Sequence, residues 1–315
     1  MKKRSLFLVQ IILFGLFSFS LLATILQSSG TLNSLVRFEQ STPVYNHTEA
    51  YDPALSRLNS LGMLERYCDS IYSQRIFEDP AAQFQTTYTE VVSTTIRNRF
   101  FHGYSYYSFN DNYISTVSSK ITIPGLNALV IPDEILKYPY AACSQQSLVM
   151  MEVLKHRGFK TRKVGFLGKK FGGHFAFEVF YDNAWHFNDP NLEPDKNVLN
   201  DYGRPGIDFL VHNPDVLLKA YSRYPKEKIM DIFPNYFYGP VNTFPAPRAI
   251  IFQKITKFLS YTSWLFFLVA FLIVRRRYLR VKAKLYIRNG GIAGPRLQKE
   301  TPSIYYPDYP SAQGA

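Results

Sequence analysis

Residues 139–190 read PYAACSQQSLVMMEVLKHRGFKTRKVGFLGKKFGGHFAFEVFYDNAWHFNDP, and they determine how the rest of the chain is interpreted. Pro139 ends any helix that precedes it. From Ser144 onward, apolar residues recur at helical spacing until Gly158, which can cap the C-terminus of a helix. The pattern therefore predicts a helix that begins at Cys143.

A cysteine at the start of a helix has particular chemistry. The backbone N–H groups and the helix dipole stabilise negative charge there, so the thiol ionises more readily to the nucleophilic thiolate. The same N–H groups can hold the negative oxygen that develops when a carbonyl is attacked. Cys143 is therefore a candidate nucleophile.

Three strands are predicted after this helix. The first covers 159–167, and a glycine-rich turn, GKKFGG, leads into a second strand at 174–181. Asp182 and Asn183 then reverse the chain into a third strand at 185–189. These residues predict an antiparallel hairpin that carries His174 at its start.

The length of the hairpin loop decides whether His174 can meet an aspartate. A two-residue loop pairs Tyr181 with Ala184. Counting back along both strands then pairs Ala176 with Asp189, and Ala176 shares its face with His174. Asp189 would lie diagonally across from His174, about 7–8 Å away at the backbone and within reach of a side-chain hydrogen bond. A three-residue loop without a bulge would put them on opposite faces, and the sequence leaves both loops open.

A Cys that attacks, a His that takes its proton and an Asp that orients the His form the set of groups used in acyl-transfer chemistry. The stretch resembles the core of the transglutaminase-like superfamily, in which a helix-start Cys is followed by a hairpin His and a W..D-P segment. Here these are Cys143, His174, and Trp185 with Asp189 and Pro190. The resemblance implies an α+β fold with a papain-like core, Cys143 as nucleophile, His174 as base, Asp189 as third member, and no cofactor.

The sequence departs from the family pattern at two places. Ala141 and Ala142 precede the Cys, where the family often has a Gly or another small residue two back. Phe175 and Ala176 follow the His, where the family often has Ala and Trp. Neither change removes a catalytic atom. The superfamily includes cross-linking enzymes, peptidases, amidases and inactive members, so the resemblance points to a site more than to a substrate.

The net charge of +12 is concentrated at the two ends of the chain. Residues 2–4 are all basic, and residues 275–315 contain nine Lys or Arg against two acidic residues. The intervening part is nearly neutral, which argues against nucleic acid as a partner.

Two uncharged apolar runs predict membrane-spanning helices at 5–26 and 258–274. The first follows residues 1–4, of which 2–4 are basic, and this places the N-terminus in the cytoplasm. A cleaved signal peptide is the alternative, but the run is longer than a usual signal core and no clean A-x-A follows. The second is short for a span, yet its basic flank at 275–277 fits. Both runs predict that 27–257 lie outside the cytoplasm and that 275–315 form a basic cytoplasmic tail.

The predicted extracytoplasmic domain covers 51–248, with its core at 139–190, and follows a polar linker at 27–50. Asp52 with Pro53 opens a helix to about 74, and Asp79 with Pro80 opens another that ends before 103. Both should pack behind the Cys143 helix.

The tyrosine-rich segment 101–114 either lines an acyl groove and supplies a phenol to the oxyanion hole, or is a surface turn. Residues 115–138 have no clear pattern.

The segment after the hairpin has no recognisable chemistry. Residues 192–205 are rich in Asn, Asp and Pro and predict a loop, 214–224 predict a short helix, and 233–248 an extended segment.

The remaining candidate residues have ordinary interpretations. Cys68 could pair with Cys143, but a small buried hydrophobe in a helix is the favoured interpretation. Glu178 shares the His174 face, either as a partner of the triad or as a solvated carboxylate. A metal site is disfavoured because no CxxC or HxxxH spacing occurs.

These observations predict a membrane-tethered, Cys-dependent acyl transferase or hydrolase, of the peptidase, amidase or transglutaminase kind, that acts on a peptide or amide through a thioester. Its substrate would be a peptide or protein outside the cytoplasm. One alternative is a binding or scaffolding module that keeps the fold without turnover. The other is an assembly subunit of an envelope system, with envelope proteins as partners.

Overall fold

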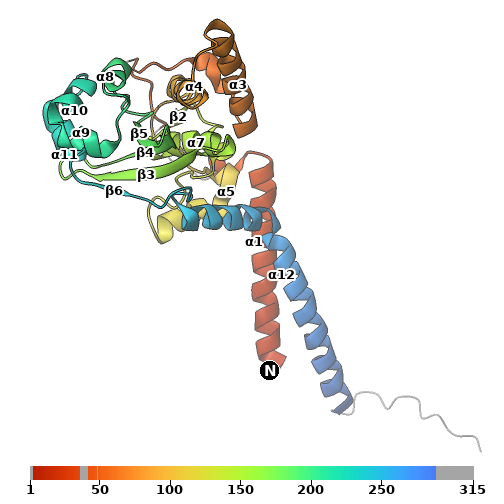
Figure 1. Ribbon diagram of the computed structural model, residues 1–315. Coiled ribbons are helices and arrows are strands. Elements are labelled where there is room, and N and C mark those ends of the chain that lie inside the picture. The colour runs from red at the N-terminus through yellow and green to blue at the C-terminus, as the bar shows by residue number, and fades with distance from the viewer. Residues whose placement is uncertain (1–2, 36–41, 48, 289–315) are drawn as a thin grey trace, which may run out of the picture. The chain divides into compact units, whose positions relative to one another are not determined.

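The computed structural model describes residues 3–35, 42–47 and 49–288. Its secondary structure is a mixture of helices and strands, as the sequence predicts (Figure 1). The chain divides into a large unit, Leu22–Thr262, and a second unit, Met1–Leu21 with Ser263–Ala315. The described residues of the second unit, 3–21 and 263–288, are helical, and we call it the helical unit. The candidate residues Cys143, His174 and Asp189 all belong to the large unit.

An antiparallel sheet of four strands runs through the large unit in the order β5-β4-β3-β6 (Figure 1). The strands are β3 Lys160–Leu167, β4 Gly173–Tyr181, β5 Ala184–Asn188 and β6 Tyr236–Tyr238. Tyr181 pairs with Ala184, so Asp182 and Asn183 form the two-residue loop. Both loop residues have positive φ angles, 46° and 58°, as a type I′ turn requires. The predicted hairpin register is confirmed.

Helix α7, Cys143–His156, packs on one face of the sheet. Leu148, Val153 and Leu154 are buried there, in the same core as Phe177 and Val179 of β4. Complete burial of such a side chain contributes about 1.5–3 kcal/mol. Helix α4, Phe84–Arg99, packs on α7, and α3, Leu61–Glu78, packs on α4. The prediction that N-terminal helices lie behind the Cys143 helix is confirmed.

The opposite face of the sheet is covered by a group of short helices (Figure 1). They are α8 Lys196–Asp201, α9 Ile207–His212, α10 Pro214–Ala220 and α11 Lys226–Ile232. Val164 and Phe166 of β3 pack with Ile207 and Leu210 in this second core. The short helix predicted near 214 is confirmed as α10. The loop predicted at 192–205 is wrong in part, because it contains α8, whose N-terminus is capped by Asp195.

The predicted N-terminal helices begin at other residues than expected. Asp52 does cap a helix, but only the 3₁₀ turn η1, Pro53–Arg57, and α3 begins separately after Ser60, which caps Met63 N. Asp79 lies at the C-terminal end of α3, and α4 begins only at Phe84. The Asp79 carboxylate accepts from Ala81 N, which holds a turn where the sequence suggested a helix.

The segment between α4 and α7 contains further short elements. They are β1 Phe101–His102, α5 Phe109–Ile121, α6 Pro132–Ile135 and β2 Tyr140–Ala141. β1 and β2 pair in parallel, with His102 opposite Ala141. The tyrosine-rich segment therefore lies beside the residues that lead into Cys143.

A buried arginine holds this segment in place. Arg99 is 1% exposed, and its guanidinium donates to the backbone carbonyls of Leu136 (2.6 Å), Tyr138 (3.1 Å), Leu58 and Ser56 (both 3.3 Å). Burial lowers the pKa of this guanidinium to about 10, so it stays charged at neutral pH. Arg99 thus joins η1 and the residue after it to the chain just before β2.

The two ends of the large unit close on each other through a hydrogen-bonded clasp. Gln27 Nε2 donates to Ser260 Oγ (3.2 Å), and Thr24 Oγ1 donates to Ser260 O (3.0 Å). Gln27 Nε2 also lies 3.3 Å from the backbone carbonyl of Asp111, at the start of α5. We call Thr24, Gln27 and Ser260 the clasp.

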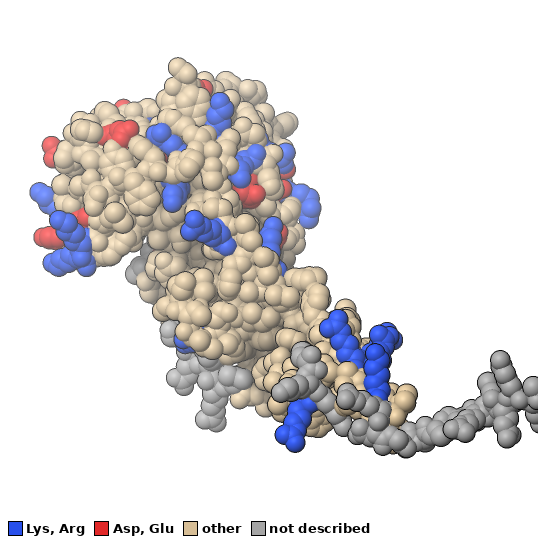
Figure 2. All heavy atoms as spheres, turned by 90° about the horizontal axis from the view of Figure 1, so that it is seen from below, with Lys and Arg blue, Asp and Glu red and all other residues tan. Residues whose placement is uncertain are grey.

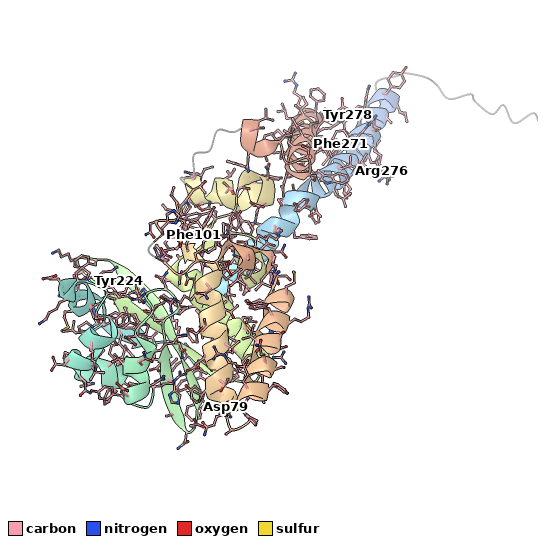
Figure 3. All side chains as sticks on the ribbon, turned by 90° about the horizontal axis from the view of Figure 1, so that it is seen from above. Asp79, Phe101, Tyr224, Phe271, Arg276 and Tyr278 are labelled. Carbon is pink, nitrogen blue, oxygen red and sulfur yellow. The ribbon has the colours of Figure 1, made fainter. Side chains whose placement is uncertain are left out.

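The helical unit consists of parts of α1, Lys3–Ser28, and α12, Pro247–Arg288. Both helices are long and apolar enough to span a membrane. The rings of Phe14 and Phe271 pack at 5.6 Å, and those of Phe7 and Tyr278 at 6.0 Å, so the two helices lie side by side (Figure 3). Figure 2 shows Lys and Arg side chains near the end of α12.

The second apolar helix differs from its predicted bounds. It begins at Pro247 rather than at 258, and it continues to Arg288, so the first part of the predicted basic tail is helical. Residues 289–315 of that tail lie outside the described residues.

Candidate active site

The turn into α7 fixes the position of Cys143. Ala142 is the N-cap residue, and the buried side chain of Gln145 accepts from its backbone N (3.1 Å). The same amide accepts from Ser105 N (3.0 Å) and donates to Ser105 O (2.8 Å) and Leu129 O (2.9 Å). The first turn of α7 is therefore tied to the tyrosine-rich segment. As the first helical residue, Cys143 has no intrahelical acceptor for its backbone N–H.

His174 is positioned by the glycine-rich turn before β4. The carboxylate of Asp231 accepts from the backbone N–H groups of Lys169, Lys170 and Phe171, which closes the turn. His174 then pairs with Phe166 on β3, and its ring stacks on that phenyl ring at 5.8 Å. The turn and the strand register place the imidazole at the end of the sheet.

Asp189 follows β5 and meets His174 as the hairpin register predicts. His174 Nε2 lies 2.7 Å from Asp189 Oδ2, and the two residues are only 8% and 4% exposed. The other carboxylate oxygen, Oδ1, accepts from the backbone N–H groups of Asn191 (3.2 Å) and Leu192 (3.1 Å). Tyr221 donates its hydroxyl to Oδ2 (2.9 Å). The Asp189 carboxylate is thus held by four donors.

The charges of this group are coupled. Burial lowers the pKa of His174, but the Asp189 carboxylate and the Cys143 side chain raise it more, to about 10. Burial raises the pKa of Asp189, but the imidazolium and the donated hydrogen bonds bring it below its ordinary value. The pair is therefore an imidazolium and a carboxylate at neutral pH. Since Nε2 faces Asp189, Nδ1 is the ring nitrogen left for the Cys143 thiol, which hydrogen-bonds to this imidazole.

The tyrosine-rich segment supplies two neighbours of the pair. Tyr104 hydrogen-bonds to Ser144, and burial and the charge of Cys143 raise the pKa of its phenol. Desolvation and the nearby charge of His174 lower the pKa of His102, whose Nδ1 lies 3.0 Å from Asn191 Nδ2. The sequence singled out the tyrosines but not His102. Its position opposite Ala141 depends on a two-residue parallel pairing that leaves no periodic signal.

Two cavities flank the start of α7. One, of about 220 Å³, is lined by aromatic residues of the tyrosine-rich segment and of β2, including Tyr104, Tyr106, Tyr107, Tyr138 and Tyr140. We call it the tyrosine cavity. The other, of about 280 Å³, is lined by polar groups that include Glu49, Gln146, Asn191, Arg223 and Tyr224 (Figure 3 labels Tyr224). We call it the polar cavity.

Gln146 links the polar cavity to the nucleophile helix. It lies in the first turn of α7 and is 2% exposed. Its Nε2 donates to Ala141 O (2.9 Å), while no described residue donates to its Oε1. An unpaired buried acceptor is costly, so a hydrogen-bond donor in this cavity would be stabilised.

Glu178 differs from both interpretations offered by the sequence. It is fully buried, and its Oε2 pairs with Arg162 Nη2 at 2.6 Å, while its Oε1 accepts from Ile207 N at 2.7 Å. It is neither a solvated carboxylate nor a partner of His174, because a non-local cation on β3 neutralises it.

The two cysteines do not form a disulfide, and the described residues do not form a metal site. Cys68 and Cys143 are both free thiols, and Cys68 is fully buried, as its interpretation as a small hydrophobe predicts. Among the described residues, no three His, Cys, Asp or Glu side chains gather as a metal site would require.

The structure therefore brings the three predicted site residues together at one end of the sheet. The two cavities are lined by residues that flank Cys143 in the chain, Tyr140 in one and Gln146 in the other. Compared with known protein families, curated proteins and solved structures, the chain has no match.

Proposed function

We propose that the large unit is a Cys-dependent acyl transferase or hydrolase with a transglutaminase-like, papain-like core. The observation that carries the proposal is the buried His174–Asp189 pair, held at 2.7 Å beside a cysteine at a helix N-terminus. An imidazolium next to a thiol favours the thiolate, and the helix N-terminus favours it further. This is the arrangement that nucleophilic acyl transfer needs.

The catalytic cycle follows from the positions of the protons. The Cys143 thiolate attacks an amide carbonyl and forms a C–S bond. The imidazolium of His174 gives its proton to the leaving amine as the C–N bond breaks, which leaves a thioester and a neutral imidazole. Water or a second amine then attacks the thioester, and His174 takes up a proton from it. The thiolate leaves, and the imidazolium is restored.

Two donors would stabilise the tetrahedral oxyanion. The backbone N–H of Cys143 is one. The phenol of Tyr104 is the second, because it lies near Cys143 and bonds to Ser144. The two cavities would hold the substrate on either side of the scissile amide, and Gln146 Oε1 would accept from a substrate N–H in the polar cavity.

The site belongs to a protein with two candidate membrane spans, so the enzyme would act close to a bilayer. The basic residues next to each span favour cytoplasmic chain ends and an extracytoplasmic large unit. The substrate would then be a peptide or protein outside the cytoplasm.

Alkylation of Cys143 tests the activated thiolate. The full chain in detergent is treated with iodoacetamide at pH 7, and the rate of modification is measured by mass spectrometry. Cys68 is fully buried and stays unmodified in the folded protein. We expect His174→Ala to slow the reaction about 100-fold, the lower range for a lost acid–base partner.

The matched control is His186→Ala. His186 is also a buried strand histidine, 7% exposed, but it bonds to the backbone carbonyls of Arg204 and Tyr181 rather than to the triad. It should leave the rate unchanged. Equal rates in the wild-type protein and His174→Ala would overturn the proposal.

A second experiment separates turnover from a reactive but non-catalytic thiol. The full chain is mixed with p-nitrophenyl acetate, and acetylation of Cys143 and release of nitrophenol are followed together. We expect a burst equal to the enzyme concentration, then steady release. Alkylation without any acetylation would instead support a binding or assembly module.

A further inference from the structure

In the first turns of α12, residues 247–262, polar side chains are buried and apolar side chains are exposed. This is the reverse of the pattern in a surface helix of a soluble protein. Gln253, Thr256 and Ser260 are buried, at 0%, 5% and 0% exposure. Ile251, Ile255 and Phe258 are on the outside, with 58%, 53% and 59% of their surface exposed. Both sets follow three- and four-residue spacing, so each forms one face of the helix. A helix at the surface of a soluble protein turns its apolar face inward.

Helix α5 repeats this reversal. Asn112, Ser115, Thr116 and Ser119 are buried, although all four are polar. Val117 and Ile121 are exposed, and so is Ile123 just after the helix. The two helices are joined by a hydrogen bond from Asn112 Nδ2 to Thr256 Oγ1 (3.0 Å).

The buried polar faces are held by hydrogen bonds, so neither helix can roll its apolar face inward without losing them. Gln253 donates to Ala128 O (2.6 Å) and accepts from Val130 N (3.2 Å). Thr116 donates to the carbonyl of Tyr107 (3.0 Å). Leaving such buried groups unpaired is unfavourable. The outward direction of the apolar side chains is therefore a stable feature of the fold.

We propose that this apolar face lies in the headgroup region of a lipid bilayer and seats the large unit on the membrane. We call it the outward face, made of Val117, Ile121, Ile251, Ile255 and Phe258. The occupant is identified by continuity, because α12 runs on past Thr262 without a break into an apolar stretch long enough to span a bilayer.

The polar members of the outward face fit the same environment. Lys254 is exposed between Ile251 and Ile255, and a lysine there can bury its stem while its ammonium reaches the phosphates. Tyr261, 41% exposed, follows Phe258 by one turn, at the level where aromatic side chains are enriched at membrane interfaces. Segments of this kind lie about 5–10 Å into the boundary between headgroups and acyl chains.

The seat restricts what the site can reach. With the outward face in the bilayer, the large unit contacts the membrane through its own residues and is not held by the spans alone. The burial and hydrogen bonds that orient this face do not involve Cys143, His174 or Asp189, so the seat does not depend on the proposed chemistry.

Spin labelling of the full chain in phosphatidylcholine vesicles tests the seat. Ile255→Cys, Phe258→Cys and Ile121→Cys are labelled with a nitroxide in a Cys143→Ala background, and collisions with oxygen and with a water-soluble nickel chelate are compared. Oxygen concentrates in lipid and nickel in water. We expect an oxygen-to-nickel ratio about tenfold higher at these positions than at the control, for side chains at interfacial depth.

The control is Phe77→Cys. Phe77 is 88% exposed and equally apolar, but it lies at the end of α3, next to Asp79, which Figure 3 places at the edge of the large unit away from α5. Ratios at 121, 255 and 258 equal to the Phe77→Cys ratio would overturn the proposal. Low collision rates with both reagents, together with spin–spin broadening, would overturn it in favour of a second copy of the chain. Protection of Cys68 verifies that each variant is folded.

Discussion

The end of the sheet that holds His174 and the layer formed by α5 and the first turns of α12 both bury polar side chains, but of different kinds. At the sheet end the buried groups are ionised, His174 and Asp189. In the helical layer they are neutral amides and hydroxyls, such as Asn112 and Gln253. Ionised groups couple stability to pH, whereas neutral groups do not. The sheet end is therefore suited to proton transfer, whereas the helical layer is suited to holding α5 and α12 in place at any pH.

Removing the carboxylate should have the largest effect. Asp189→Ala leaves His174 and the donors from Asn191, Leu192 and Tyr221 without their acceptor. Breaking a buried ion pair in this way costs about 3–5 kcal/mol. We expect the melting temperature of the full chain in detergent to fall by about 10 °C, at 2–4 °C per kcal/mol for a unit of this size.

Asp189→Asn is the matched control for that variant, because it keeps an acceptor oxygen for Asn191 N and Leu192 N. Its loss should be clearly smaller. Equal losses for Ala and Asn would mean that the retained acceptor oxygen contributes nothing and that the whole loss comes from the missing charge.

The stability that the His174–Asp189 pair contributes should depend on pH, unlike that of the neutral helical layer. The folded pKa of His174 is about 10, above the ordinary value of 6.5, so the stabilisation is complete below about pH 6.5 and is lost as the pH rises through 10. The folded pKa of Asp189 is lowered, so its contribution is present above the ordinary 3.8 and is lost as the pH falls through the folded value. The melting-temperature difference between the wild type and Asp189→Asn should therefore shrink between pH 6.5 and 10. A difference that stays constant over this range would contradict the ionised pair.

In the neutral layer, Gln253→Leu should have an intermediate effect. The substitution keeps the side-chain volume close but removes the acceptor for Val130 N and a donor to Ala128 O. We expect a loss of about 1–3 kcal/mol, read as a lower melting temperature, and the same loss at pH 6.5 and pH 9. A loss that varied with pH would show that the two regions are coupled.

Tyr221→Phe should have the smallest effect. It removes one hydroxyl donor to Asp189 but leaves the ring, which packs on Phe233 at 4.7 Å. A hydrogen bond to a charged group contributes about 1.5–3 kcal/mol, and the remaining three donors keep the carboxylate paired, so the lower end is expected. A loss as large as that of Asp189→Ala would mean that Tyr221, not His174, is the main partner of the carboxylate.

The sequence was informative where the signal was local. The Asp182 and Asn183 loop sets the hairpin register, and the register brings Asp189 to His174. Tyr221 lies 32 residues beyond Asp189, in a segment whose pattern indicated only a short helix. Nothing near it in the sequence points to a buried carboxylate.

The sequence misled where polarity is reversed. Residues 249–257, which include Gln253 and Thr256, lie between the predicted domain and the predicted second span, and the sequence predicts no element there. The structure buries those two residues and makes the segment helical. Helix α5 went unpredicted for the same reason, since its buried residues Asn112, Ser115 and Ser119 are polar. A pattern search that expects apolar residues inside cannot find such helices.

The clasp between Gln27, Thr24 and Ser260 has a mechanical consequence. It joins the two points at which the chain enters and leaves the large unit. A force that separates α1 from α12 would therefore act on these side-chain hydrogen bonds. Neither β4 nor β5 contributes a residue to the clasp, so the contacts that join α1 to α12 are separate from those that hold His174 and Asp189.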